Sequence, residues 1–274
     1  MKQLRRPWPS RDVSPQRRGA IRQCAALGYT GAHRSIATRP LGDKLKVLAI
    51  VPAYNEEENI VSTVSDLVSN APGVDHVVIN DGSTDATEAI CLEHGFNIIT
   101  LPVNLGLAGG FQTGMKYAYA NGYDYAIQFD ADGQHSAAYV WPMVKQAEAD
   151  GSDIVIGSRF CAQKKPISAR MAGSTLITAM IRLTTGKKIQ DPTSGMRLFD
   201  RDMIRRFALS YDYSPEPDTI ALCIRNGAKV SEMQVEMRDR VAGESYLNFT
   251  KSVAYMLRVC ISIMFVQWFR KKVS

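Results

Sequence analysis

Residues 125–135, YAIQFDADGQH, decide the fold of this chain. The stretch opens with apolar and aromatic residues typical of a buried strand and then changes abruptly to Asp130, Ala131, Asp132 and Gly133. Two carboxylates at one strand end repel each other unless a cation lies between them. Mg²⁺ commonly takes one or two carboxylates together with substrate phosphates. The alternative is a polar turn, in which Asp and Gly serve local hydrogen bonds and positive φ.

Strand-like runs alternate with helical patterns along the chain, which predicts an α/β fold. The expected strands are residues 47–51, 76–80, 97–101, 125–129, 154–157 and 230–235. Pro52 is expected to end the first strand. Polar residues follow three of them, namely Asp81, the pair Asp130 and Asp132, and Arg159. Open α/β sheets bind ligands beyond the carboxyl ends of their strands, so we expect these side chains around one ligand.

Three later segments add candidate residues. Residues 164–188 have a helical and basic pattern, and residues 191–199, DPTSGMRLF, are expected to form a compact loop. Residues 211–220 present two acids, Glu216 and Asp218.

Composition limits the classes of function. The 274 residues, 45% hydrophobic and 22% charged, suffice for one domain with a sizeable core. Five scattered cysteines without C-x-x-C spacing indicate reduced thiols in a cytosolic protein. The net charge of +6 comes from residues 1–42, which carry +8 and leave −2 for the rest. A nucleic-acid partner is therefore not expected.

The two ends of the chain differ from its middle. Residues 1–43 form a basic segment without a core-forming pattern, expected to be a disordered leader or the product of an upstream start site, with a transit peptide as the alternative. Residues 44–250 are expected to form a single catalytic domain. Residues 251–274 form an apolar helix with basic flanks, short for a membrane span. It either lies at a membrane interface or packs on the core.

Six motifs in order resemble the family-2 glycosyltransferases with the GT-A fold, a Rossmann-like, mainly parallel sheet flanked by helices. They are VPAYNEEENI, INDGSTD, NLGLAGGFQTG, FDADGQH, GSRF and DPTSGMRLF, and the match covers residues 45–248. Within the family, the chain looks most like the enzymes that load a sugar onto a polyprenyl phosphate, such as dolichyl-phosphate mannosyltransferase.

The resemblance implies a nucleotide-diphosphate sugar as donor and Mg²⁺ or Mn²⁺ as cofactor. Carried over by position, Pro52, Tyr54 and Glu56 hold the base and ribose, and Asp81 reads the base. Asp130 and Asp132 bind the metal and the diphosphate, Gln134 lies beside the donor, and Arg159, Arg170 and Arg240 face phosphates.

The acceptor is open at this point. A polyprenyl phosphate is already an anion and needs no strong base, which fits an inverting enzyme on the cytosolic face of a membrane. A saccharide hydroxyl needs a general base, for which Glu216 or Asp218 is the candidate. Two other classes are a haloacid-dehalogenase-like phosphatase, because FDADG resembles its entry motif, and a binding module without catalytic activity.

Overall fold

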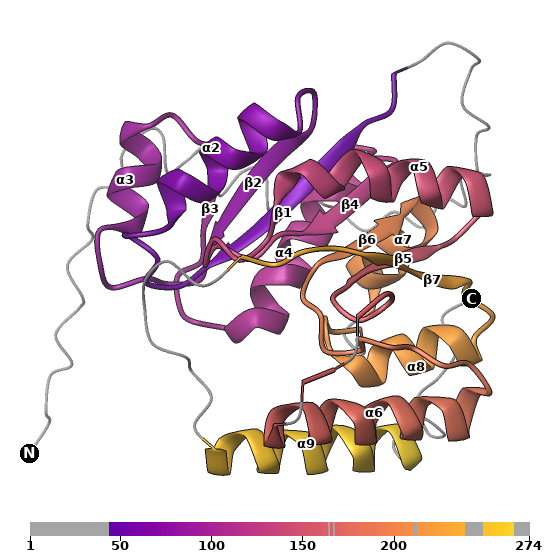
Figure 1. The fold of residues 1–274 in the computed structure, drawn as a ribbon. Helices are drawn as coiled ribbons and strands as arrows, with labels where there is room; N and C mark the ends of the chain where they lie inside the picture. The colour runs from indigo at the N-terminus through magenta and orange to yellow at the C-terminus, as the bar shows by residue number, and fades with distance from the viewer. Residues whose placement is uncertain (1–43, 164, 167, 211–212, 239–248, 266–274) are drawn as a thin grey trace, which may run out of the picture. The chain divides into compact units, whose positions relative to one another are not determined.

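The computed structural model of this chain describes residues 44–265, except 164, 167, 211–212 and 239–248, with the backbone alone at 169–170 and 249–254. The expected leader and Arg240 lie outside the described residues. The described part contains a seven-stranded sheet in the order β3-β2-β1-β4-β6-β5-β7 (Figure 1). β6 runs antiparallel to both of its neighbours, and the other pairs are parallel. The predicted mixed, mainly parallel α/β architecture is confirmed.

The strands are β1 (Val47–Ala53), β2 (Asp75–Asn80), β3 (Ile98–Thr100), β4 (Tyr125–Gln128), β5 (Ile154–Ser158), β6 (Arg197–Asp200) and β7 (Val230–Gln234). The helices are α2 (Ile60–Asn70), α3 (Thr87–Glu93), α4 (Gly106–Ala120), α5 (Val140–Asp150), α6 (Ala169–Thr185), α7 (Arg201–Leu209), α8 (Pro217–Arg225) and α9 (Phe249–Met264), with a short 3-10 turn η1 (Ala137–Tyr139).

Alternate residues of each central strand supply two cores, one on each face of the sheet. Val47, Ala49 and Val51 of β1 point into the core covered by α2 and α5. Leu48 and Ile50 point into the other core, which α4, α7 and α8 cover and which α6 and α9 complete (Figure 1). Burial on both faces explains why these strands read as continuous apolar runs.

The antiparallel strand β6 corrects one prediction. The segment 191–199 was expected to be a loop throughout, but its last residues lie in β6, between β4 and β5. Because β6 runs in the opposite direction, its beginning lies at the edge where β4 and β5 end. The loop before β6, which contains Asp191 and Gly195, therefore lies at the same edge as Asp130 and Arg159. These two residues follow β4 and β5, and β6 lies between those strands in the sheet.

A second correction concerns Pro52, which does not end β1. The carbonyl oxygen of Ala53 accepts a hydrogen bond from the backbone N–H of Asp81 on the β2 side. The backbone nitrogen of the preceding Pro52 therefore points toward β4. The β1–β4 ladder ends at the pair Ile50–Gln128, so the missing N–H of proline costs no ladder bond there.

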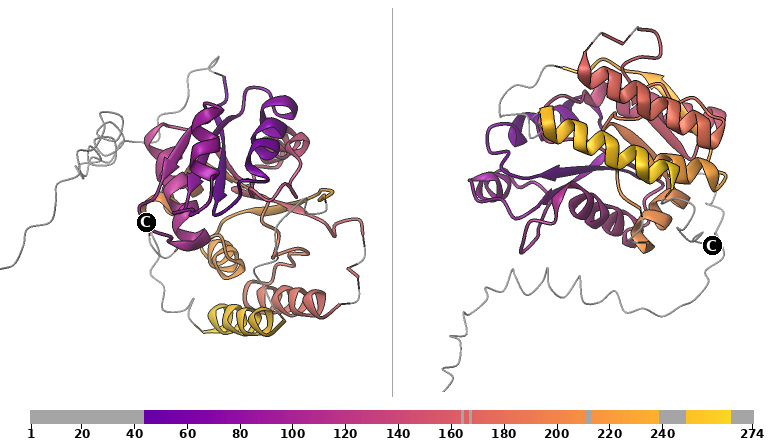
Figure 2. Two further views of the ribbon diagram at one scale, coloured as in Figure 1. Left: turned by 90° about the vertical axis from the view of Figure 1, so that its left-hand side faces the viewer. Right: turned by 90° about the horizontal axis from the view of Figure 1, so that it is seen from below.

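The terminal helix α9 packs against α6 and α8, and Figure 2 shows α6 and α9 side by side. Val259 and Ile263 of α9 are buried in the core, whereas Leu257, Ile261 and Phe265 are exposed. The helices cross closely because Gly173 has no Cβ, which would lie 1.4 Å from the sulfur of Met256. Core packing and an exposed apolar stripe thus occupy opposite sides of one helix. In the part of the chain that the structure describes, no helix has the length and apolar character of a membrane span.

Two glycines of α4 provide a test of the packing between α4 and β1. A Cβ at position 114 would lie 2.2 Å from Cγ2 of the fully buried Ile50. Gly114→Ala should therefore lower the free energy of unfolding by about 1–3 kcal/mol. At position 110, a Cβ would meet its nearest neighbours at 3.7 and 3.8 Å. Gly110→Ala should instead raise the free energy of unfolding by about 0.5–1 kcal/mol, because alanine is the better helix former. Urea denaturation of both variants measures the difference, and equal stabilities would contradict the packing.

Candidate functional site

The Asp130 side chain is held by contacts on several sides at the carboxyl edge of the sheet. Its Oδ1 accepts a hydrogen bond from Nε2 of Gln128 at 2.9 Å, and Oδ2 lies 3.6 Å from Nε2 of His135. A Cβ on Gly195 would lie only 2.3 Å from that same Oδ2. The carboxylate is 33% exposed, so it is held on several sides and remains open on one.

His135 fixes the turn that carries both aspartates. Its Nδ1 accepts the backbone N–H of Asp130 at 3.0 Å, which leaves the proton of the neutral ring on Nε2, facing the carboxylate. The ring is buried edge-on against Phe129. Asp132 is buried as well, and its Oδ1 accepts the backbone N–H of Gln134 at 3.1 Å. The side chains of His135 and Asp132 thus fix the turn through the backbone N–H groups of Asp130 and Gln134.

The loops after β1 and β2 are joined by hydrogen bonds between them. The backbone N–H of Asn55 donates to Oγ of Ser83, and Oδ1 of Asn55 accepts the N–H of Thr84. The backbone N–H of Glu56 donates to Oγ1 of Thr87. Asn55 adopts a left-handed φ of 56°, which Asn tolerates better than most residues. The paired loops bring Glu56 near the residues that follow Asp81.

Asp81 links this pair of loops to α4. It is buried, and its Oδ1 accepts the backbone N–H of Leu105 at 2.7 Å, just before α4 begins. Gly82 has φ +70°, and a Cβ there would lie 2.9 Å from the backbone of Val103 and Asn104. Pro52 packs beside Gly110 of α4, and Tyr54 is 46% exposed. The four residues predicted for the nucleotide thus come from adjoining strand ends.

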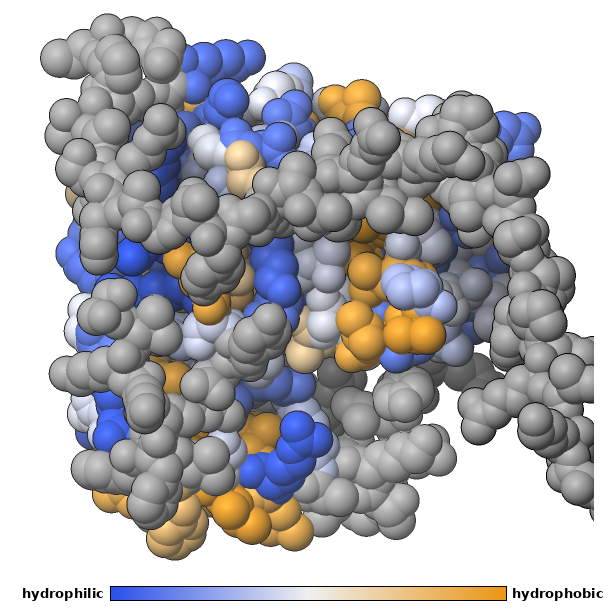
Figure 3. Space-filling view, turned by 180° about the vertical axis from the view of Figure 1, so that it is seen from behind, coloured by the Kyte–Doolittle hydropathy of each residue, from blue (hydrophilic) through white to orange (hydrophobic). Residues whose placement is uncertain are grey.

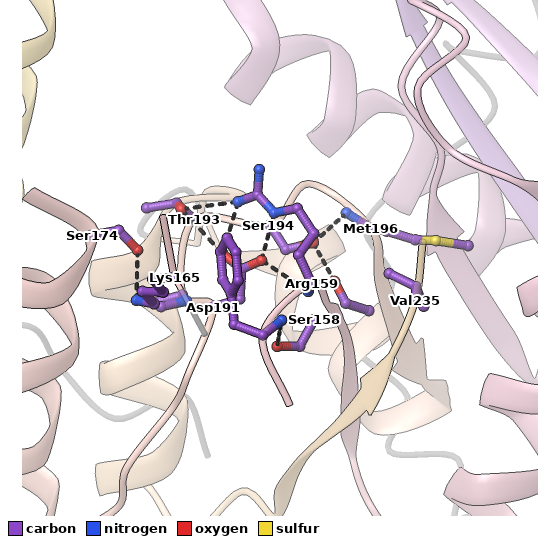
Figure 4. Close-up of polar contacts among 12 residues, drawn as sticks. Ser158, Arg159, Lys165, Ser174, Asp191, Thr193, Ser194, Met196 and Val235 are labelled. Atoms are coloured by element: carbon purple, nitrogen blue, oxygen red, sulfur yellow. Dashed lines mark hydrogen bonds and ion pairs between the residues drawn. The ribbon is translucent and has the colours of Figure 1, made fainter. Parts of the chain in front are cut away.

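Arg159 forms a two-pronged ion pair with Asp191, which the sequence did not anticipate (Figure 4). Its Nε donates to Oδ2 at 2.7 Å and its Nη2 to Oδ1 at 2.8 Å, while the carboxylate is fully buried. The backbone N–H of Asp191 donates in turn to Oε1 of Glu232 on β7. Among the described residues, none accepts a hydrogen bond from Nη1 of Arg159, whose side chain is 24% exposed.

A second cation lies beside this pair. Nζ of Lys165 donates to Oγ of Ser174 at 3.0 Å and lies 5.6 Å from the centre of the Phe160 ring, which also carries Arg159 at 5.1 Å. Burial lowers the pKa of Lys165, and the negative charges of Asp191 and Glu232 partly offset this shift. Two cations and a hydroxyl therefore gather between β5 and α6, and only Arg159 was predicted. Arg170 begins the same helix, but its side chain lies outside the described residues.

Glu216 and Asp218, the predicted alternatives for a general base, face α9. The hydroxyl of Tyr255 donates to Oε2 of Glu216, and Oγ of Ser262 donates to Oδ2 of Asp218 at 2.5 Å. Burial raises the pKa of Tyr255 and the Glu216 carboxylate raises it further, so the phenol stays a donor. Both carboxylates line a cavity of about 430 Å³ whose other wall is α9, with Arg258 at its side.

The aspartate pair fits a divalent cation that completes its coordination with a ligand. Asp130 and Asp132 provide oxygen donors at one strand end. In the described part of the chain, no group of three or more His, Cys, Asp or Glu side chains is arranged to hold a metal. Two carboxylates plus phosphate oxygens are a usual environment for Mg²⁺.

Comparison with known proteins places the chain among sugar transferases. The model of the family described as glycosyl transferase family 2 matches residues 48–207. A polyprenol monophosphomannose synthase of Mycolicibacterium smegmatis is 26% identical, over 78% of this chain and 85% of that protein. An undecaprenyl-phosphate mannosyltransferase of Micrococcus luteus is 28% identical, over 74% of this chain and 88% of its own.

A solved structure shares the fold. Glucosyl-3-phosphoglycerate synthase from Mycobacterium tuberculosis, crystallised with Mn²⁺, UDP-glucose and phosphoglyceric acid, superposes with a TM-score of 0.61 at 18% identity. The superposition covers 83% of this chain and 81% of that one. The predicted GT-A architecture is thereby confirmed.

The Arg159–Asp191 pair can be tested by stability. Asp191→Asn keeps the shape but replaces acceptor oxygens with an amide and leaves the guanidinium without its counter-charge. The free energy of unfolding should fall by about 2–3 kcal/mol, somewhat less than for a fully buried pair because Arg159 is partly exposed. Asp124→Asn is the control, because its partner Arg201 is 50% exposed, so the loss of this pair should change stability by at most about 1 kcal/mol. Equal losses in urea titrations would show that the buried pair does not organise the site.

Proposed function

The chain belongs to glycosyl transferase family 2, and we propose that it transfers a sugar from a nucleotide-diphosphate sugar to a polyprenyl phosphate, with inversion at the anomeric carbon. One observation carries the proposal. A carboxylate site for a cation and a cationic site for a second anion lie at the same edge of the sheet, separated by β6 and its preceding loop. Membership of this enzyme family makes the phosphatase alternative wrong.

The donor occupies the side formed by β1, β2 and β4. Pro52, Tyr54 and Glu56 border the base and ribose, with Asp81 beneath them. Asp130 and Asp132 hold Mg²⁺ or Mn²⁺, which when bound supplies positive charge to the departing diphosphate. Gln134 lies beside the donor at the end of the same turn.

The acceptor phosphate occupies the side formed by β5 and α6. Arg159 is preoriented by Asp191 and keeps Nη1 for a phosphate oxygen, while Lys165 and Ser174 add a cation and a hydroxyl. Arginine suits phosphate oxygens because its donors form a planar fork. Arg170 and Arg240 remain proposed phosphate ligands from the sequence pattern.

The reaction needs no strong base. A phosphate monoester has a second pKa near 6, so it is mostly a dianion at neutral pH. One of its oxygens attacks the anomeric carbon, the bond from that carbon to the nucleotide diphosphate breaks, and the bonding pair leaves on the diphosphate. Glu216 and Asp218 are bonded to hydroxyl groups of α9, which favours this acceptor over a saccharide hydroxyl that would have to be deprotonated.

Removing one carboxylate of the cation site tests the donor chemistry. Asp132→Asn removes a charge that balances the cation, so nucleoside diphosphate release with polyprenyl phosphate and Mn²⁺ should fall at least about 100-fold. Asp124→Asn, at the opposite edge of the sheet, should keep wild-type turnover. A panel of nucleotide sugars identifies the donor first, and EDTA should abolish release. Full activity of Asp132→Asn or of the EDTA-treated enzyme would contradict the proposal.

We place the protein at the cytosolic surface of a membrane, where a polyprenyl chain is anchored. The outer faces of α6 and α9, with the residue that follows α9, carry five exposed apolar residues, Leu176, Leu183, Leu257, Ile261 and Phe265. Figure 3 shows hydrophobic side chains gathered along the lower edge of the molecule, where these helices lie. Neither helix contains an acidic residue, so exposed Arg182 and Arg258 favour anionic lipid by about 1 kcal/mol each.

Charge placed on this apolar stripe should weaken membrane binding. Ile261→Glu introduces an acid at a residue that is 56% exposed, so the core is spared. Flotation with liposomes that contain phosphatidylglycerol should fall severalfold, because the helix loses both apolar area and its purely basic character. Leu92→Glu on α3, where the leucine is 61% exposed, is the matched control and should float like wild type. Equal flotation of all three proteins would refute the assignment of this face to lipid.

A further inference from the structure

Two buried polar side chains lie beneath the candidate cation site, and the reaction described above does not use them. Gln128 ends β4 and Arg197 begins β6, and they are direct partners in the antiparallel ladder. Gln128 is 1% and Arg197 2% exposed. Side chains of directly opposed residues project from the same face of a sheet and lie within contact distance.

The Gln128 amide has one possible orientation. Its Nε2 donates to Oδ1 of Asp130, two residues beyond the end of β4, at 2.9 Å. The flipped amide would turn its oxygen toward the carboxylate and lose this bond. The carboxylate therefore fixes the amide, and Oε1 is left buried with no hydrogen-bond partner among the described residues.

The Arg197 guanidinium joins two loops. Its Nη1 donates to the carbonyl oxygen of Pro215 at 2.7 Å, and its Nη2 donates to that of Pro192 at 2.8 Å. The first carbonyl precedes Glu216, and the second follows Asp191, the partner of Arg159. Burial lowers the pKa of Arg197, yet an arginine keeps its charge in proteins. Its Nε is buried and, within the described part of the chain, unbonded.

The two unbonded atoms are complementary. One is an acceptor, Oε1 of Gln128, and the other is a donor, Nε of Arg197, on side chains that face each other across the ladder. Buried polar atoms without partners are rare in folded proteins and call for an explanation. The structure shows no bond between them, but a small side-chain shift that formed one would complete a chain of donors from Arg197 through Gln128 to Asp130.

We propose that Gln128 and Arg197 are positioning residues for the transfer: a buried amide–guanidinium pair that orients the Asp130 carboxylate for the cation and ties it to the loops on the acceptor side. This inference rests on the proposed function. Gly195 supports it from the other side, since its missing Cβ lets the same loop that Arg197 holds lie against Oδ2 of Asp130. Donor and acceptor sites are thus joined through one buried guanidinium. Hydrogen-bond partners of metal ligands tune affinity in this way at other metal sites.

Binding of Mn²⁺ alone to the full-length chain, followed by electron paramagnetic resonance, tests the pair without relying on turnover. Gln128→Met keeps size but removes the amide, and should raise the Mn²⁺ dissociation constant on the order of 10- to 100-fold. Arg197→Lys keeps the charge but loses the fork, and should raise it severalfold. The losses in the double variant should be less than additive, because the part of the arginine's effect that runs through the amide is already absent in Gln128→Met.

Gln146→Met is the control, since that amide bonds Ser231 on the far side of β5. It should leave Mn²⁺ binding unchanged. If Arg197→Lys does not fold, Gln128→Met decides alone. Mn²⁺ affinity within about twofold of wild type in folded Gln128→Met would overturn the positioning role, while sugar transfer by the wild type would leave the proposed function standing. A wild-type chain that binds no Mn²⁺ and transfers no sugar would overturn both.

Discussion

The Asp130 carboxylate, held at the end of a buried strand, is the constraint on which the site depends. A carboxylate that shares a cation with Asp132 must be held in one orientation, because a metal ligand binds only when its oxygen faces the ion. The chain orients it with Gln128, His135 and Gly195, and leaves one side open. In the proposed function, a cation that brings its own phosphate ligands occupies the open side, and the donor diphosphate is then part of the site.

The direction of the antiparallel strand β6 determines where the loop with Asp191 and Gly195 lies in this glycosyltransferase. Because it runs opposite to β4 and β5, the loop before it reaches the edge where those strands end. That loop supplies Asp191, which orients Arg159, and Gly195, which borders Asp130. The proposed donor side and the proposed acceptor side therefore meet at this loop. The exposed stripe on α6 and α9 includes α6, the helix that also carries Ser174 beside Lys165, so the proposed lipid contact and the proposed acceptor site share α6.

The local pattern of apolar and polar residues was enough to predict most strands and the polar residues at their ends, because each strand and the residues that follow it are adjacent in the sequence. It misjudged Pro52, since tolerance of a missing N–H depends on how far the neighbouring strand extends. It also read residues 191–199 as a loop, because Pro192 and Gly195 dominate the pattern and hide a four-residue strand. The partners of Arg159 and Glu216 lie 32 and 39 residues away and follow only from the fold. Gln128 was detectable, since a polar residue two places before Asp130 in an apolar strand shares its face.

The central claim is that the aspartates and the donor diphosphate bind one cation together, and its most direct measurement is the linkage between the two ligands. Titration calorimetry of the wild-type chain with UDP and with GDP, each with and without Mn²⁺, measures this linkage. The account predicts that Mn²⁺ strengthens binding of the correct nucleoside diphosphate by at least about tenfold, and that the nucleotide strengthens Mn²⁺ binding by the same factor, as linkage requires. Nucleotide binding that is indifferent to Mn²⁺, or that keeps its Mn²⁺ dependence in Asp130→Asn, would contradict it.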